Sequence, residues 1–166
     1  MANAELLVLG SKLGHALKAR GWKLALAESC TGGWVSQAVT AISGSSVWFD
    51  RGFVTYSNVA KQEMLEVAQQ TLDMHGAVSE HTALEMARGA LKHSHANITA
   101  AITGIAGPDG GTAEKPVGMV CFAWATDTGL AESVTLYLSG SREQVRRESV
   151  KTALEGLLRL TLSTDL

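Results

Sequence analysis

Three short strand-like runs constrain the fold of this chain more than any other feature. Segments with helical periodicity separate these runs from one another. The runs cover residues 22–27, 49–56 and 98–103. Strands that alternate with helices are joined by crossover connections and run parallel to one another. The order of these segments therefore predicts an α/β fold in which the three strands are parallel members of one sheet.

Helical patterns also occupy both ends of the chain. Residues 5–20 carry an apolar stripe of helical period that Gly21 ends. The last helix opens at Ser141, and its spacing to Gln144 predicts a capping box. The spacing of Thr82 to Glu85 fits a second capping box, at the start of another helix. The other expected helices are those over residues 31–42, after Ser57 or Asn58, and after Ser79 or Thr82.

Two more strands follow without an intervening helix. Residues 119–125 are apolar on both faces, which is typical of a central strand. Residues 127–129 (Asp-Thr-Gly) predict a hairpin turn, and residues 130–138 alternate apolar with polar side chains. The fourth strand is therefore expected to run antiparallel to the first three, and the fifth parallel to them. The prediction is a five-stranded mixed sheet with one antiparallel strand.

This topology brings several polar clusters together. In open α/β sheets, ligands bind beyond the carboxyl ends of the parallel strands. Strands one, two, three and five all end at the same edge of the predicted sheet. The residues at those ends are Ser29, Tyr56, Thr103 and Gly140-Ser141-Arg142. We therefore expect the functional site at this edge.

Ser29 is the candidate nucleophile. It stands in the segment Ala-Glu-Ser-Cys-Thr-Gly-Gly over residues 27–33, between a strand and a helix start. Such a turn can place a hydroxyl beside free backbone N–H groups, which stabilise an oxyanion or bind an anion. The plainer interpretation is that Ser29 and Thr31 only cap a helix.

Lys61 is the candidate base, because a serine is a weak nucleophile unless another group takes its proton. None of the five histidines stands at a predicted strand end. Lys61 falls in the first turn of a helix, where the helix dipole and partial burial both disfavour the ammonium form. Tyr56 could orient this lysine or relay a proton. The plainer interpretation of Lys61 is a solvated surface lysine.

Cys30 is the rival nucleophile, since thiolates at helix N-termini are activated. We rank it behind Ser29, because the next residue along the turn is expected to point the other way, into the packing layer. A small buried residue is the plainer interpretation of this cysteine.

Two further segments are candidates for ligand binding. The glycine-rich loop over residues 104–116 lacks the Gly-Lys-Ser/Thr ending of a P-loop, which argues against a nucleoside triphosphatase. Its glycines allow close approach of a ligand to the backbone. Arg142, at a helix N-terminus, fits a phosphate, with Arg146 and Arg147 continuing the positive charge. An ordinary capped helix with solvated arginines is the alternative.

Length and composition set limits on the rest. The 166 residues suit one domain, over residues 1–166, and the 46% of hydrophobic residues suffices for a core. Only 18% of the residues are charged, which favours a homodimer or higher homo-oligomer. The net charge of −2 and the lack of a basic run argue against a nucleic-acid partner.

The sequence also argues against a membrane protein, a disulfide-bonded protein and a metalloprotein. No apolar run is long enough for a membrane span, and no signal peptide is visible, so we expect no membrane association. The two cysteines, Cys30 and Cys121, lack a CxxC spacing, which indicates a reducing, cytoplasmic compartment. His93 and His95 are spaced such that a helix would not aim both at one ion, so we predict no metal. No cofactor is expected.

Several segments, taken together, resemble one protein family along essentially the whole chain, the CinA C-terminal domain family. The segments that carry the resemblance are AESCTGG at 27–33, GS-S-WF-RGFVTYSN across 44–58, GAVSE at 76–80, TGIAGPDGG at 103–111 and EKPVG at 114–118. The resemblance implies a three-layer α/β/α sandwich around a five-stranded mixed sheet with one antiparallel strand. This agrees with the topology inferred above.

The resemblance also implies an activity. Stand-alone members of the family are similar to nicotinamide-nucleotide amidohydrolase, which converts nicotinamide mononucleotide to nicotinate mononucleotide and ammonia. The family's nucleophilic serine falls on Ser29, and its tyrosine and lysine fall on Tyr56 and Lys61. Its threonine falls on Thr103 and its arginine on Arg142. The expected partner is a small-molecule nucleotide.

The predicted site combines these assignments. We expect Ser29, Lys61 and Tyr56 to be catalytic. The expected substrate-binding residues are Cys30, Thr31, Gly32, Gly33, Thr103, Gly104 and Arg142. The N–H groups of residues 30–33 would stabilise the oxyanion. The alternatives are a non-catalytic nucleotide-binding or regulatory paralogue with the same pocket, and an amidohydrolase for a different pyridine or nucleotide.

Overall fold

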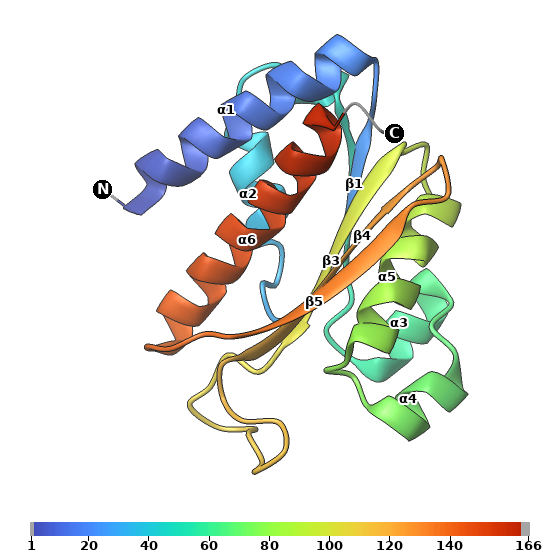
Figure 1. Ribbon diagram of the computed structural model, residues 1–166, viewed down its shortest axis with the longest axis vertical. Coiled ribbons are helices and arrows are strands. Elements are labelled where there is room, and N and C mark those ends of the chain that lie inside the picture. Colours follow the sequence, from blue (N-terminus) through green and yellow to red (C-terminus); the bar gives the residue numbers. More distant parts are fainter. Residues whose placement is uncertain (1, 164–166) are drawn as a thin grey trace.

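A computed structural model describes residues 2–163 and contains one five-stranded sheet with helices on both faces (Figure 1). The strands are β1 (Leu24–Glu28), β2 (Phe49–Val54), β3 (Ile98–Gly104), β4 (Met119–Thr126) and β5 (Ala131–Tyr137). The helices are α1 (Ala2–Arg20), α2 (Trp34–Thr40), α3 (Asn58–Leu65), α4 (Gln69–His75), α5 (Glu80–Lys92) and α6 (Arg142–Leu162), with a short 3₁₀ turn over Ser45–Val47.

The sheet confirms the predicted topology. Its strand order is β2-β1-β3-β4-β5. Strand β1 pairs in parallel with both β2 and β3, while β4 runs antiparallel between β3 and β5. The last residue of β1, Glu28, stands opposite Val54 of β2 and Ile102 of β3. The carboxyl ends of these three strands therefore lie side by side.

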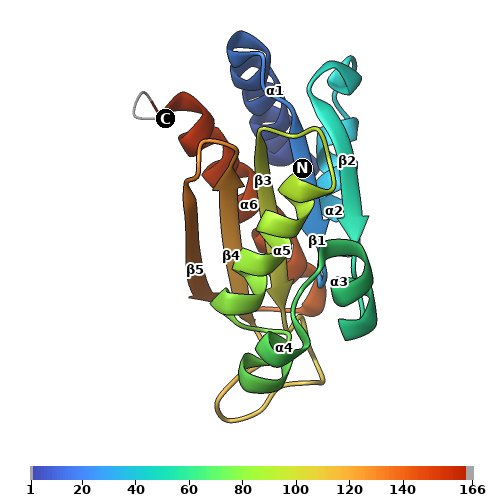
Figure 2. The same ribbon diagram turned by 90° about the vertical axis from the view of Figure 1, so that its right-hand side faces the viewer.

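The helices form two layers, one on each face of the sheet. Helices α1, α2 and α6 cover one face, and α3, α4 and α5 cover the other (Figures 1 and 2). Each layer packs against its own apolar cluster. The first includes Leu13, Leu26 and Leu154, and the second includes Leu65, Met86 and Ala101. The three-layer α/β/α arrangement is as predicted, because β1, β3 and β4 are buried on both faces.

A glycine fixes the position of the helix that carries Lys61. Gly89 of α5 lies against the end of α3, and a Cβ atom added there would come within 2.0 Å of the Leu65 carbonyl oxygen. Any side chain at position 89 would push the two helices apart. This close approach holds α3 against the sheet beside the carboxyl end of β2.

Several local predictions are corrected by the structure. Helix α2 begins at Trp34 rather than at residue 31, because Gly32 and Gly33 adopt positive φ angles of 58° and 102° that turn the chain first. Helix α4 was not predicted. The capping box at Thr82 is wrong, since the N-cap of α5 is Ser79, whose side chain accepts a hydrogen bond from the Thr82 N–H.

Glu85 does not form the capping box that its spacing to Thr82 predicted. Its carboxylate accepts hydrogen bonds from the Ala68 N–H and the Thr71 hydroxyl, and so ties α4 to α5. By contrast, the capping box between Ser141 and Gln144 at the start of α6 is present, as predicted. None of the helices in residues 2–163 combines the length and the apolarity that a membrane crossing needs.

Candidate active site

A cavity of about 290 Å³ opens at the carboxyl ends of β1, β2 and β3. Seven of the predicted site residues line it, namely Ser29, Cys30, Tyr56, Lys61, Thr103, Gly104 and Arg142. The wall is completed mainly by the loop after β3, with Ile105, Ala106, Gly107, Asp109 and Gly110. Thr31, Gly32 and Gly33 are not among the lining residues. Ala77 and Val78, before α5, also line it, so the cavity lies at the predicted edge and joins residues from five separate parts of the chain.

Ser29 and Lys61 meet at the floor of this cavity. The Lys61 Nζ atom lies 3.1 Å from the Ser29 Oγ atom, within hydrogen-bonding distance. Lys61 is only 2% exposed, and Ser29 is 9% exposed. Burial disfavours the charged ammonium and lowers the pKa of the Lys61 side chain. A neutral amine beside a serine hydroxyl can accept its proton.

The backbone of β2 and α3 holds the lysine in this position. Its amine donates a hydrogen bond of 2.9 Å to the Thr55 carbonyl oxygen, one residue beyond β2. Ser57 caps α3 by accepting a hydrogen bond from the Ala60 N–H. We expected Tyr56 to orient the lysine. The structure gives that role to the Thr55 carbonyl, while the Tyr56 hydroxyl faces Arg142.

Cys30 lies in a different environment from Ser29. It is 6% exposed and belongs to the apolar cluster under α1, α2 and α6. Burial raises the pKa of the Cys30 thiol to about 12, so that the thiol stays protonated at neutral pH. A protonated thiol is a poor nucleophile. This agrees with the ranking of Ser29 before Cys30.

Glu28 fixes the turn that carries Ser29, and sequence reasoning missed it. Its side chain is fully buried at the N-terminus of α2. One carboxylate oxygen accepts from the Thr31 hydroxyl at 2.6 Å and from the N–H groups of Gly33 and Val35. The other accepts from the N–H and the hydroxyl of Ser36. The Glu28 carboxylate is therefore the anion that binds and stabilises the N-terminus of α2.

This arrangement corrects part of the predicted oxyanion site. The Gly33 N–H and the Thr31 hydroxyl are bound to Glu28, and the Gly32 N–H donates to the Ser29 carbonyl oxygen. Within residues 2–163, the Thr31 N–H has no hydrogen-bond partner, and the Cys30 N–H has none beyond its own thiol. These two donors remain for an oxyanion, out of the four that we expected. An acidic residue directly before the nucleophile was the sequence signal for this carboxylate cap.

Replacement of Glu28 by glutamine is expected to lower the free energy of unfolding by about 2–4 kcal/mol. The amide nitrogen that replaces one oxygen cannot accept hydrogen bonds, so it leaves buried donors without a partner. Urea denaturation of Glu28→Gln measures the loss. Glu63→Gln, at an exposed glutamate of α3, is the control and should change little. Equal stability of both variants would contradict this role of Glu28.

Arg142 is the cation at the mouth of the cavity. It is exposed, and its guanidinium donates to the Gly107 carbonyl oxygen at 2.8 Å and to the Tyr56 hydroxyl at 3.0 Å. The side chain thus spans the opening from the start of α6 to the end of β2. A planar guanidinium in this position can bind a phosphate through two parallel hydrogen bonds.

Thr103 lines the cavity, but its hydroxyl is already engaged. It donates a hydrogen bond of 2.7 Å to the Ala77 carbonyl oxygen and so ties the segment before α5 to the end of β3. Gly104 is required by packing, because a Cβ atom there would lie 2.7 Å from a methyl group of Val120. Both residues shape the cavity wall.

Arg146 and Arg147 do not extend the cationic mouth as predicted. Arg146 donates to the carbonyl oxygens of Cys30 and Thr31, both at 3.1 Å, behind the turn that carries Ser29. Arg147 pairs with Glu5 of α1 and with Glu148. A helix turns by about 100° per residue, so neighbouring arginines leave α6 in different directions.

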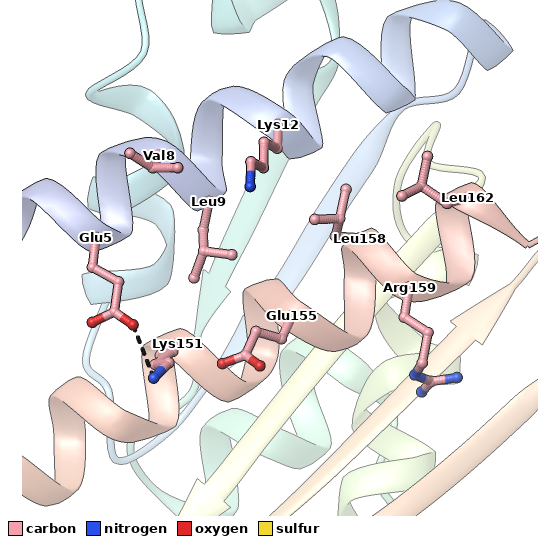
Figure 3. A pocket seen from close by; sticks show the side chains of 9 residues that line it. All are labelled: Glu5, Val8, Leu9, Lys12, Lys151, Glu155, Leu158, Arg159 and Leu162. Atoms are coloured by element: carbon pink, nitrogen blue, oxygen red, sulfur yellow. Dashed lines mark ion pairs between the residues drawn. The ribbon is translucent and has the colours of Figure 1, made fainter.

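A larger groove of about 650 Å³ lies between α1 and α6, on the outer side of that layer (Figure 3). Figure 3 shows apolar side chains such as Leu9 and Leu158 between charged ones, with Glu5 paired to Lys151 at 2.9 Å. Among the described residues that line it, none is a serine, threonine or cysteine that could act as a nucleophile. Within the described residues, no cluster of three or more histidine, cysteine or acidic side chains could hold a metal ion.

Comparison with known proteins gives consistent matches. The model of the CinA C-terminal domain matches residues 8–161. The chain is 54% identical to nicotinamide-nucleotide amidohydrolase PncC of Escherichia coli K12 over 95% of each chain, and 44% identical to the protein of that name from Pseudomonas putida over 92% and 94%. A CinA-like protein of Syntrophobacter fumaroxidans is 49% identical, but only 33% of that longer protein is covered.

Solved structures that are similar to this chain carry names of the same kind. A competence/damage-inducible protein of Agrobacterium tumefaciens is similar with a TM-score of 0.92 at 46% identity, over 94% of this chain and 95% of that one. A CinA superfamily protein of Escherichia coli has a TM-score of 0.90 at 39% identity, over 93% and 90% of the two chains.

Proposed function

This chain belongs to the CinA C-terminal domain family, and from that premise we propose that it hydrolyses the carboxamide of nicotinamide mononucleotide to nicotinate mononucleotide and ammonia. The observation that carries the proposal is the buried contact of 3.1 Å between Ser29 Oγ and Lys61 Nζ in the cavity at the sheet edge. The names of the relatives from Escherichia coli and Pseudomonas putida support the choice of substrate.

The first half of the reaction forms an acyl-enzyme. The neutral Lys61 amine accepts the Ser29 proton, and Oγ attacks the carboxamide carbon. The N–H groups of Cys30 and Thr31 then donate to the oxyanion of the tetrahedral intermediate. Lys61, now an ammonium, gives its proton to the departing nitrogen. The C–N bond breaks, and ammonia leaves.

The second half returns the enzyme to its starting state. Lys61 takes a proton from a water molecule, which attacks the ester carbonyl of the acyl-enzyme. The same two N–H groups stabilise the second oxyanion. Collapse of this intermediate releases nicotinate mononucleotide, and the proton on Lys61 returns to Ser29 Oγ. A buried lysine suits both steps, since burial lowers its pKa and so favours the neutral amine that accepts a proton in each of them.

Arg142 supplies the contact to the phosphate in this proposal. Its guanidinium would exchange the neutral Tyr56 hydroxyl and Gly107 carbonyl for the dianionic phosphate, which forms stronger, charge-assisted hydrogen bonds. Tyr56 keeps the guanidinium over the cavity when no substrate is bound. The reaction would serve the recycling of pyridine nucleotides, since it converts an amide form of the nucleotide to the acid form.

Ammonia release from nicotinamide mononucleotide tests the proposal, with nicotinamide riboside as the substrate that lacks the phosphate. The wild-type protein is expected to prefer the mononucleotide. Arg142→Met should raise KM for the mononucleotide by about 10–100-fold and leave the riboside nearly unchanged, because hydrogen bonds to charged groups contribute about 1.5–3 kcal/mol each.

Arg159→Met, at the opposite end of α6, is the matched control and should leave both substrates unaffected. If the wild-type protein binds the mononucleotide without releasing ammonia, the proposal is wrong and a non-catalytic nucleotide-binding module is indicated. Equal turnover of mononucleotide and riboside would point to an amidohydrolase that does not recognise the phosphate.

A further inference from the structure

We propose that Arg146 is a positioning residue for the oxyanion site, an inference that rests on the proposed amidohydrolase function. Its Nε atom donates to the Cys30 carbonyl oxygen, and a terminal guanidinium nitrogen donates to the Thr31 carbonyl oxygen, both at 3.1 Å. The planar fork of the guanidinium thus holds two peptide groups of this turn, Cys30–Thr31 and Thr31–Gly32, in one orientation.

The direction of these carbonyls determines the direction of an N–H group. The peptide between Cys30 and Thr31 is planar and trans, so its C=O and its N–H point in opposite directions. Because Arg146 holds the Cys30 carbonyl, the Thr31 N–H must point away from Arg146. Without this contact, the peptide could rotate and turn the N–H out of the site.

The two layers of helices show which face of the sheet the Thr31 N–H points to. Arg146 approaches the turn from α6, on one face of the sheet, while Lys61 approaches Ser29 from α3, on the other face (Figures 1 and 2). An N–H that points away from Arg146 therefore points away from the face of α6 and toward the face from which α3 carries Lys61. This is where the oxyanion of an attacked amide would form.

The other N–H groups of the turn are already engaged. Glu28 binds the Gly33 N–H and the Thr31 hydroxyl, and the Ser29 carbonyl accepts from the Gly32 N–H. Among the N–H groups of this turn in the described part of the chain, only those of Cys30 and Thr31 have no partner outside their own residue. Glu28 fixes the donors and Arg146 fixes the carbonyls, and together they leave these two N–H groups free for substrate.

Arg146 acts through the turn rather than on the substrate. It is not among the residues that line the cavity. Its guanidinium also lies over the Trp34 ring, 5.4 Å from the ring centre, which fixes the side chain against the start of α2. Arg142, one helical turn earlier, reaches the cavity itself. The two arginines of α6 therefore have separate tasks, and their variants should change different kinetic constants.

Steady-state kinetics with nicotinamide mononucleotide tests this assignment. Arg146→Met is expected to lower kcat by about 10–100-fold and to leave KM within about threefold, since the oxyanion exists only along the reaction path. Arg146→Lys, which keeps the charge and can reach one of the two carbonyls, should retain an intermediate kcat. Ser29→Ala and the double variant Ser29→Ala/Arg146→Met should bind the mononucleotide equally well.

Arg147→Met is the matched control, because Arg147 is the next residue of α6 and joins that helix to α1 through Glu5. Its kcat should equal that of the wild type, with a loss of thermal stability comparable to that of Arg146→Met. The inference is overturned if Arg146→Met raises KM and keeps kcat, or if both variants have the same kcat. A wild-type protein that releases no ammonia would overturn the proposed function itself, and this inference with it.

Discussion

Replacement of Ser29 by alanine is expected to abolish release of ammonia from nicotinamide mononucleotide, with kcat at least about a thousandfold below that of the wild type. The hydroxyl is the atom that forms the acyl-enzyme, and the buried Cys30 thiol cannot replace it, because burial keeps that thiol protonated. Ammonia and nicotinate mononucleotide, quantified in the same reaction, give the measurement.

Cys30→Ala is the matched control at the adjacent position. It removes a buried thiol of the apolar cluster and should lower stability slightly while kcat stays within about tenfold of the wild type. Calorimetric binding of the mononucleotide to Ser29→Ala separates lost chemistry from lost folding. Activity that survives in Ser29→Ala and disappears in Cys30→Ala would assign the reaction to the thiol.

Replacement of Lys61 by methionine is expected to lower kcat by about a thousandfold, within the range that general base catalysis contributes. Methionine fits the same narrow space, and it removes an amine that is 2% exposed, so the variant should remain folded. Lys61→Arg should be equally inactive, because a guanidinium stays protonated and cannot accept the Ser29 proton.

Lys92→Met, at an exposed lysine of α5 that pairs with Glu66, is the control for the loss of a positive charge. It should leave kcat unchanged. Melting temperatures of the variants show whether any of them has lost its fold. An active Lys61→Arg variant would contradict the assignment of Lys61 as the base, since only its charge would then matter.

The directions of the strands and the place of the site could be predicted from the sequence, because both follow from local patterns and topology. Alternation with helices makes β1, β2 and β3 parallel, and their carboxyl ends must then meet. Ser29 and Lys61 are 32 positions apart in the chain. The rule placed Ser29 and Tyr56 at one edge, and the predicted start of a helix directly after Tyr56 placed Lys61 near them. The apolar surroundings of Cys30 likewise follow from its place in the turn.

What could not be predicted depends on where individual side chains point. The position of Glu28 directly before Ser29 is visible in the sequence, but the number of donors that surround its carboxylate depends on how the turn after β1 folds. Arg146 was grouped with Arg142, although one helical turn separates them by about 5.4 Å along the axis. That distance moves Arg146 from the mouth of the cavity to the back of the Ser29 turn. Helix α4 has no apolar stripe long enough to reveal it.

The most direct test of the central claim, that a neutral Lys61 activates Ser29, is the pH dependence of kcat/KM for nicotinamide mononucleotide. Burial lowers the pKa of Lys61, so the active neutral amine is present above that pKa and is lost as the pH falls through it. The account predicts that kcat/KM rises with pH and levels off above a pKa that is lower than that of an exposed lysine. A kcat/KM that is independent of pH from about pH 6 to about pH 10, or that rises only with the ionisation of an ordinary lysine, would contradict it.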